Sequence, residues 1–366
     1  MPRGVENQST HLTKPCVGAP KGLRKHPPQS INQDILSRLR DSGCDSELLL
    51  ARLAYQEHEG TRKDLAKLGD VSRVFPTILP TQASLRWSTK EPNLGGFTRE
   101  FWRLHYNVVL PDDGWWWLGW DWQGIEARMF LGYTGDQEDL DLLEMGPELH
   151  TFTCAKYLME WAPRVLPGCQ TSDLHLPHDW LGGKDERRVR AKNFRYGVGQ
   201  YGTSAKAVLG IPGIEKLGLD RVTLQQRAER FLAARPKAVA WKWTIWQQCI
   251  EQRSARTFMG HRRHLYGDED TRKKDGLNHM IQGSVANMMN WCLIEIDQQV
   301  YPESHMILNK HDGALVAFPD RLNQEQVVPA VRSIVEREWE IGPGITMRFP
   351  GEWEVLTSDG GRREIT

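Results

Sequence analysis

Runs of apolar residues separated by polar turns predict strands at two places in the chain. The aromatic run at 115–120 follows a turn at 111–114 and contains only Trp, Leu and Gly, which is typical of a strand buried on both faces. Farther along, the apolar runs 306–308 and 314–318 flank the polar segment 309–313 and predict a hairpin with charge at its tip. Polar side chains at the ends of such strands would be firmly anchored by the buried sheet.

Helical periodicity covers much of the remaining sequence. Apolar residues recur at helical spacing in two short segments within 31–68, and residues 124–259 are mostly helical in pattern, with Gly and Pro at the breaks. Residues 278–299 and 324–339 predict two further helices, and 353–356 predicts one more strand. This mixture of elements, without internal repeats, predicts an α+β fold.

Composition narrows the class of protein without identifying it. The 366 residues carry 47 Lys and Arg against 47 Asp and Glu, so nucleic-acid binding would have to come from local clusters and not from overall basicity. Residues 1–30 are basic and rich in Pro, Gly and Ser, which predicts a disordered leader. The six cysteines lie far apart without metal-binding spacing, as is typical of free thiols in a reducing cytoplasm. No apolar stretch approaches the length of a membrane span.

Two aspartates follow predicted strands, Asp121 after the aromatic run and Asp312 at the tip of the hairpin. Carboxylates at neighbouring strand ends can hold two divalent ions roughly 3.5–4 Å apart, a spacing that activates a 3′ hydroxyl and stabilises a leaving pyrophosphate. Hard oxygen ligands suit Mg²⁺. On these two residues alone, ordinary turn aspartates are the more frequent case, so other segments must decide.

A basic segment at 187–197 carries two cations and an aromatic side chain on one helix face, because Arg188, Lys192 and Tyr196 recur every four residues. A triphosphate requires such a row, with Arg188 as a planar fork, Lys192 as a point charge and proton donor, and Tyr196 against the sugar and base. The alternative is a solvated basic helix. A second cluster of cations and aromatics at 253–266 is suited to track a nucleic-acid backbone, although charge runs are more often simply solvated.

Read in order, these segments resemble DNA polymerase family A, the group of bacterial DNA polymerase I and several phage replicases. The segment DWQGIEAR, which begins at Asp121, resembles the family's motif A, DYSQIELR. This resemblance implies a metal ligand at Asp121 and a steric gate against the ribose 2′ hydroxyl at Glu126. The segment RWSTKEPNL, which begins at Arg86, resembles RLSSTDPNL and implies that Arg86 contacts the minor groove at the primer end. The resemblance covers roughly residues 48–366.

Motif B of the family, the triphosphate-binding helix of the fingers, is matched by Arg188, Lys192 and Tyr196. Tyrosine at position 196 resembles the phage replicase type and implies ready acceptance of dideoxynucleotides. The second tyrosine of the motif is displaced, since Gln200 occupies its position and Tyr201 follows one residue late. Either a one-residue bulge restores Tyr201 to the nucleotide site, or Gln200 takes its place and fidelity changes.

Two later segments complete the resemblance. NHMIQG resembles the family's NxxxQG helix, which implies that Asn278 and Gln282 face the template-primer. His311 and Asp312 resemble the start of motif C, which implies that His311 lies near the primer terminus and that Asp312 is the second metal ligand. Gly313 stands where the family has glutamate, so an auxiliary carboxylate is missing and we expect weaker metal affinity.

The resemblance implies a right-hand polymerase with an antiparallel-sheet palm, helical fingers and a reduced thumb. Only 85 residues precede Arg86, too few for both a full thumb and an exonuclease domain, so we expect no proofreading. The expected order is a basic leader at 1–30, the reduced helical thumb at 31–80, the first part of the palm at 81–145, the fingers at 146–277 and the second part of the palm at 278–366.

The implied activity is template-directed DNA synthesis, a two-metal nucleotidyl transfer from a dNTP to a primer 3′ hydroxyl with two Mg²⁺ ions as cofactors. The expected partners are a DNA template-primer and dNTPs in a bacterial cytoplasm, or in the host cytoplasm for a phage protein. Because the thumb is short and the net charge is zero, we expect low processivity. A processivity or primase partner, or the basic leader, would then retain the protein on DNA.

Two rival hypotheses fit parts of the same pattern. A single-subunit RNA polymerase shares the right-hand fold and the His-Asp hairpin, but the resembling RNA polymerases lack a gate glutamate like Glu126 and carry methionine at the position of Tyr196. A catalytically inactive nucleic-acid-binding protein would fit Gly313 and the short thumb. Both metal aspartates are present in the sequence, which argues against that second rival.

Overall fold

The computed structural model of the protein describes residues 77–79, 85–90, 111–145, 149–158, 186–202, 205–211, 214–300, 303–310 and 312–365. Two compact units are present, one formed by Leu79–Ser88 and Tyr106–Thr366 and the other by Met1–Ile78 and Thr89–His105. The predicted leader and the predicted thumb helices within 31–68 lie outside the described residues, as does His311. Among the helices that are described, none combines the length and apolar character needed to cross a membrane.

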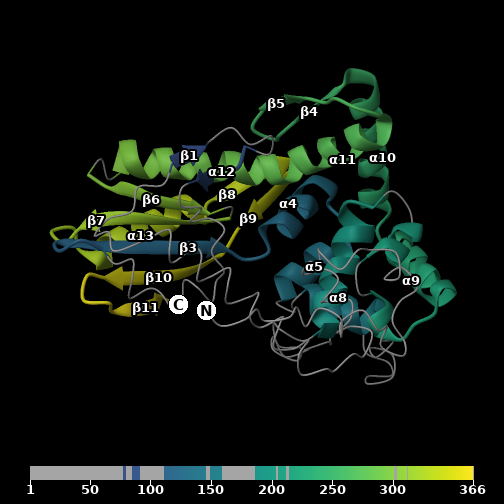
Figure 1. The fold of residues 1–366 in the computed structure, drawn as a ribbon, viewed down its shortest axis with the longest axis horizontal. Coiled ribbons are helices and arrows are strands. Elements are labelled where there is room, and N and C mark those ends of the chain that lie inside the picture. The colour runs from purple at the N-terminus through teal and green to yellow at the C-terminus, as the bar shows by residue number, and fades with distance from the viewer. Residues whose placement is uncertain are drawn as a thin grey trace, which may run out of the picture. The chain divides into compact units, whose positions relative to one another are not determined.

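The unit that contains Tyr106–Thr366 has a five-stranded antiparallel sheet in the order β11-β10-β3-β7-β6 (Figure 1). Its strands are β3 (Trp115–Trp122), β6 (His305–Lys310), β7 (Gly313–Pro319), β10 (Gly351–Thr357) and β11 (Arg362–Ile365). The predicted aromatic strand is the central strand β3, and the predicted hairpin is formed by β6 and β7. Both predictions are confirmed because long apolar runs leave little choice of partner other than a buried sheet.

Successive side chains of β3 serve opposite faces of the sheet, as the period of a strand requires. The residues that face the main core are Trp116, Leu118, Trp120 and Trp122. On the other face Trp117 packs with Ala317 and Leu356 in a smaller cluster. Since burying one large apolar side chain contributes about 1.5–3 kcal/mol, a strand with tryptophans on both faces fixes the polar residue at its end firmly.

Helices make up the rest of this unit. The α-helices are α4 (Ile125–Thr134), α5 (Gln137–Met145), α6 (Leu149–Thr153), α8 (Glu186–Phe194), α9 (Arg221–Ala233), α10 (Pro236–Gln252), α11 (Glu269–Asn278), α12 (Ser284–Ile294) and α13 (Gln324–Val335). Shorter turns are π-helical in η4 (Cys154–Leu158), η6 (Arg195–Gln200), η9 (His279–Gly283) and η10 (Glu295–Val300), and 3-10 in η7 (Ala205–Gly210) and η8 (Ile214–Leu217). In Figure 1, α12 runs beside the sheet, whereas α5, α8 and α9 gather away from it.

Three small sheets complete the described elements. They pair β1 (Thr77–Leu79) with β2 (Ser88–Lys90), β4 (Ser254–Arg256) with β5 (Arg262–His264), and β8 (Glu338–Gly342) with β9 (Ile345–Arg348).

The helix predicted at 324–339 is too long, because α13 ends at Val335 and Trp339 belongs to β8. Glu336 accepts hydrogen bonds from the backbone N–H of Gly351 at 2.9 Å and from Nε1 of Trp353 at 2.8 Å. These bonds tie the end of the helix to β10. The following residues alternate between exposed and buried, which is the pattern of a strand.

Candidate active site

Asp121 and Asp312 lie side by side where β3 meets β7. Asp121 is opposite Gly313 in the antiparallel register, and the backbone N–H of Trp122 donates to the carbonyl of Asp312 at 2.9 Å. The Asp121 side chain is exposed and that of Asp312 is partly exposed. Two aspartates that are distant in sequence therefore lie at the same end of the β3–β7 strand pair, where solvent can reach both.

Gly313 permits a close approach between β7 and β3 at this end. A Cβ atom on Gly313 would lie 2.5 Å from the carbonyl oxygen of Trp120 and 3.5 Å from the Cβ of Asp121. The first contact is with backbone, which cannot rotate away. The glutamate found here in the family would therefore require the two strands to move apart.

The donor atoms at this end are carboxylate oxygens, which are the ligands that Mg²⁺ prefers. Among the described residues, no group of three or more His, Cys, Asp and Glu side chains converges as a metal site. The predicted metal ligands Asp121 and Asp312 are therefore a pair, and the register places a further carboxylate, Glu352, opposite Asp121 on β10.

The predicted triphosphate-binding face lies on α8 and continues into η6. Lys192 Nζ lies 5.9 Å from the ring centroid of Tyr196, so these two side chains share a face. Arg188 stands one turn earlier on the same helix and is partly exposed. Tyr196 also contacts His150 of α6, with ring centroids 5.7 Å apart.

The helix changes to a π-helical turn after Phe194, and this turn absorbs the extra residue noted in the sequence. The backbone N–H of Tyr201 donates to the carbonyl of Tyr196 at 2.8 Å, five residues back instead of four. The structure therefore contains the one-residue bulge. The turn requires glycine at position 202, because a Cβ there would lie 2.1 Å from the carbonyl oxygen of Gly197.

Glu126 is the point at which several predicted site residues meet. Its carboxylate accepts from Arg86 at 2.8 Å, from Gln282 at 3.0 Å and from the Tyr201 hydroxyl at 3.1 Å. Burial and the charge of Glu126 raise the pKa of Tyr201 above its ordinary value, which keeps the hydroxyl protonated as a donor. Leu85, just before Arg86, has a φ of 62°, an uncommon backbone conformation for leucine that helps to direct Arg86.

Local sequence explains how Glu126 reaches this position. Gly124 adopts a left-handed conformation with a φ of 58°, and it lets the chain turn from β3 directly into α4. Glu126 lies in the first turn of that helix, where a carboxylate is favoured by the helix dipole. Because only a short turn separates it from Asp121, Glu126 connects the carboxylate pair with Tyr201 at the end of the helix predicted to bind the triphosphate.

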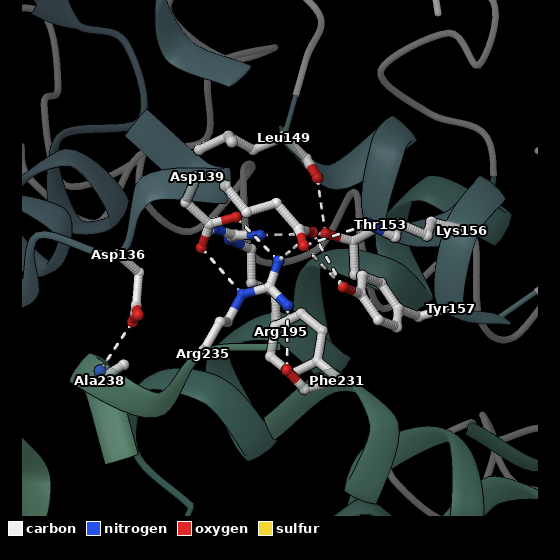
Figure 2. A network of polar contacts seen from close by, with 11 residues as sticks. Asp136, Asp139, Leu149, Thr153, Lys156, Tyr157, Arg195, Phe231, Arg235 and Ala238 are labelled. Carbon is white, nitrogen blue, oxygen red and sulfur yellow. Dashed lines mark hydrogen bonds and ion pairs between the residues drawn. The ribbon is translucent and has the colours of Figure 1, made fainter. Parts of the chain in front are cut away.

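A buried ionic network, which was not predicted from the sequence, joins α5, the first residue of η6 and the residue before α10. Asp139 lies between Arg195 and Arg235 (Figure 2), and it accepts two hydrogen bonds from Arg235 at 2.8 and 2.9 Å. Arg195 also donates to Thr153 Oγ1 at 3.1 Å. Asp139 is 1% exposed and Arg235 is 2% exposed. The signal for this network in the sequence is Arg195, a cation of the basic segment that directly precedes Tyr196.

The remaining predicted residues have less definite surroundings. Asn278 ends α11, partly exposed and one turn before Gln282. His311 is outside the described residues, so its predicted place near the primer terminus stays a prediction. The basic and aromatic cluster at 253–266 forms the hairpin β4–β5, on which Arg256 and Arg262 are exposed.

The antiparallel sheet with acidic residues at one edge, and the helices that carry the cations, have the architecture of the palm and fingers of a right-hand polymerase. Comparison with known proteins agrees with this class. The chain matches the family described as DNA polymerase family A over residues 12–352, and it therefore belongs to that family.

The most similar proteins found include bacterial polymerases of the same family. The chain is 22% identical over 276 residues to a thermostable DNA polymerase I of Thermus filiformis, a match that covers 71% of this chain and 29% of the relative. It is 22% identical over 321 residues to DNA polymerase I of Mycobacterium tuberculosis, covering 82% of this chain and 32% of that one. The chain thus spans about a third or less of the length of these curated relatives.

A solved structure has a similar fold. The POL domain of Pol1 from M. smegmatis, in complex with DNA primer-template and dNTP, aligns with a TM-score of 0.69 at 20% identity. The alignment covers 90% of this chain and 56% of that one. At this level of identity the similarity establishes the fold.

Proposed function

We propose that the protein catalyses template-directed DNA synthesis, adding deoxynucleotides from dNTPs to a primer 3′ hydroxyl. The observation that supports this most is the register that sets Asp121 beside Asp312 on neighbouring strands. Family A polymerases use divalent metal ions, and an oxygen-donor pair of this kind fits Mg²⁺. The similar structure from M. smegmatis contains DNA primer-template and dNTP, the substrates proposed here.

In this proposal Asp121 and Asp312 would hold two Mg²⁺ ions, which when bound would activate the primer hydroxyl and neutralise charge on the departing pyrophosphate. With no side chain at Gly313, the two aspartates act without an adjacent carboxylate from that position. The attacking oxygen, the α-phosphorus and the leaving oxygen would lie in line, as phosphoryl transfer requires.

Arg188 and Lys192 would bind the triphosphate from the fingers. The guanidinium of Arg188 can form paired hydrogen bonds to phosphate, whereas the ammonium of Lys192 is a point charge that can also donate a proton to the leaving pyrophosphate. Tyr196, whose ring lies near Lys192, would face the sugar and base.

Glu126 would exclude ribonucleotides by occupying the space of a 2′ hydroxyl. Three donors already fix its carboxylate, so it cannot swing aside without breaking hydrogen bonds. A rigid polar group discriminates because any displacement leaves its partly buried partners unpaired. Tyr201 and Gln282 are therefore parts of the gate as well as neighbours of the substrate.

Contacts to DNA are proposed for Arg86 at the primer-end minor groove, for Asn278 and Gln282 at the template-primer, and for His311 at the primer terminus. The proposed palm comprises 81–145 and 278–366, the fingers 146–277 and the thumb 31–80. We also propose low processivity, with a processivity or primase partner retaining the protein on DNA. Long products from a single binding event, measured with a DNA trap, would contradict low processivity.

Primer extension with Mg²⁺ tests the central proposal. Asp121→Asn and Asp312→Asn preserve size and leave the backbone bond between β3 and β7 in place, so we expect folded proteins whose extension rates fall by about 10²–10³-fold. Asp320→Asn is the matched control, since Asp320 is exposed and its backbone N–H, which the change leaves in place, donates to the carbonyl of Gly114. It should extend primers normally.

The same assay distinguishes the rivals. Preferential extension with rNTPs would favour a single-subunit RNA polymerase and contradict DNA synthesis. DNA binding without extension by the unmodified protein would favour a nucleic-acid-binding protein that has lost catalysis.

A further inference from the structure

Lys242 is a buried lysine whose amine is directed at backbone carbonyls. It lies in the middle of α10 and is 3% exposed. Its Nζ donates to the carbonyl of Gly202 at 3.0 Å and to that of Val198 at 3.2 Å. Among the described residues, no carboxylate forms an ion pair with it. Burial lowers the pKa of Lys242 to about 8.

The two carbonyls that Lys242 binds stand on either side of Tyr201. A helix leaves its last carbonyls without partners, and a π-helical turn at the end changes which ones remain. Val198 lies inside η6, and Gly202 lies just past it. One side chain of α10 thus fastens both ends of the short segment that carries Tyr201.

We propose that Lys242 is a positioning residue for sugar selection: by capping the π-helical turn it holds Tyr201 against Glu126. This inference rests on the proposed function, because the gate role of Glu126 is part of that proposal. Glu126 receives bonds from Arg86 and Gln282 as well, but neither belongs to the triphosphate-binding helix. The bond from Tyr201 is therefore the one that depends on the geometry of the turn.

Lys242→Met tests the proposal, since methionine is of similar length and lacks the amine. A cavity of about 640 Å³ borders Gly202 and Lys242, which leaves space for the thioether. Lys237→Met is the matched control, because Lys237 lies on the same helix and also donates to a carbonyl, that of Gly135 at 2.9 Å. Thermal melting of both variants checks that they fold.

The kinetic measurement is the ratio of kcat/KM for dNTP over that for rNTP. We expect Lys242→Met to lower this ratio about tenfold, with kcat for dNTP largely kept, because the loss of hydrogen bonds to a charged group frees the gate. Lys237→Met should not change it. In a Tyr201→Phe background, Lys242→Met should cause no further loss, since both changes act through one hydroxyl.

Amide hydrogen exchange at Tyr201 provides a measurement independent of activity. Lys242→Met should speed exchange of this amide, which bonds to the Tyr196 carbonyl, and Lys237→Met should not. If the unmodified protein extends no primer, the proposed function fails while exchange still decides whether Lys242 holds the turn. Unchanged discrimination, additive losses in the double variant, or equal exchange in both lysine variants would overturn the inference.

Discussion

The hydroxyl of Tyr201 donates to Oε2 of Glu126 at 3.1 Å, although a count of residues along the helix would assign this position to Gln200. The π-helical turn at 195–200 makes the difference, because it advances the chain by one residue without shifting the face. The π-helical turn therefore brings Tyr201, and not Gln200, to the carboxylate of Glu126.

Tyr201→Phe should weaken discrimination against ribonucleotides. The change removes one hydrogen bond to a carboxylate and leaves the ring, so the dNTP to rNTP ratio of kcat/KM should fall by about 5–20-fold. Gln200→Ala is the informative comparison, since its side chain is also buried on the same turn. If the alanine variant loses discrimination and the phenylalanine variant does not, Gln200 and not Tyr201 supports the gate.

The sequence pattern correctly predicted the strands that form the buried sheet. The tryptophan run of β3 and the hairpin of β6 and β7 were identified because apolar residues at nearly every position admit few other structures. The proximity of Asp121 and Asp312 was expected, and the strand register places Asp121 opposite Gly313, the residue that follows Asp312. Their roles as metal ligands await the extension assay.

Other features depend on tertiary contacts that a sequence does not display. The strand β8 was read as the end of a helix, because its alternation spans only Glu338–Gly342 and follows directly on α13. The contact of Asp139 with Arg195 and Arg235 joins three elements, and nothing near Asp139 in sequence signals it. The close approach at Gly313 also cannot be predicted from the sequence, because it depends on the position of β3 beside β7.

Restoring a side chain at position 313 should harm the protein. Gly313→Ala and Gly313→Glu would both press a Cβ against the carbonyl oxygen of Trp120, so we expect a loss of about 1–3 kcal/mol in the free energy of unfolding. Extension should fall for both, because the strands that hold Asp121 and Asp312 must separate. Urea denaturation and primer extension measure the two effects.

Gly210→Ala serves as the control for this prediction, because a Cβ on Gly210 would meet nothing within 4 Å. It should change stability by less than about 0.5 kcal/mol. A glutamate at 313 that raised activity at low Mg²⁺ without loss of stability would contradict the steric argument and indicate that the sheet edge adapts.

Tyr196→Phe should increase discrimination against dideoxynucleotides. A phenolic hydroxyl beside the sugar offers a hydrogen bond that can replace one lost with the 3′ hydroxyl, so its removal should raise the ratio of kcat/KM for dNTP over ddNTP at least about tenfold. The ring contacts with Lys192 and His150 persist in the variant, so extension with ordinary dNTPs should be preserved. An unchanged ratio would mean that the hydroxyl of Tyr196 does not reach the sugar.

Asp139→Asn should destabilise the protein strongly, because it removes the carboxylate that pairs with the buried guanidiniums of Arg195 and Arg235 and leaves Arg235, among the described residues, only its 3.3 Å contact with the carboxylate of Glu138. Breaking a buried ion pair from one side costs about 3–5 kcal/mol. Burial alone would raise the pKa of Asp139, but Arg195 and Arg235 outweigh it and lower that pKa to about 2. The folded pKa is thus below the value of about 3.9 for an unfolded aspartate, so the stabilisation is complete above about pH 5 and is lost progressively as the pH falls through 2 toward about 1.

Urea midpoints measured between pH 7 and pH 2.5 test whether the stabilisation by Asp139 decreases as the pH falls. The advantage of the unmodified protein over Asp139→Asn should shrink steadily as the pH falls from about 5 to 2.5, without vanishing at pH 2.5. Asp320→Asn is the control, since Asp320 is exposed and lies outside this network. A constant difference between the Asp139 variant and the unmodified protein down to pH 2.5 would mean that packing, and not the charge of Asp139, stabilises the network.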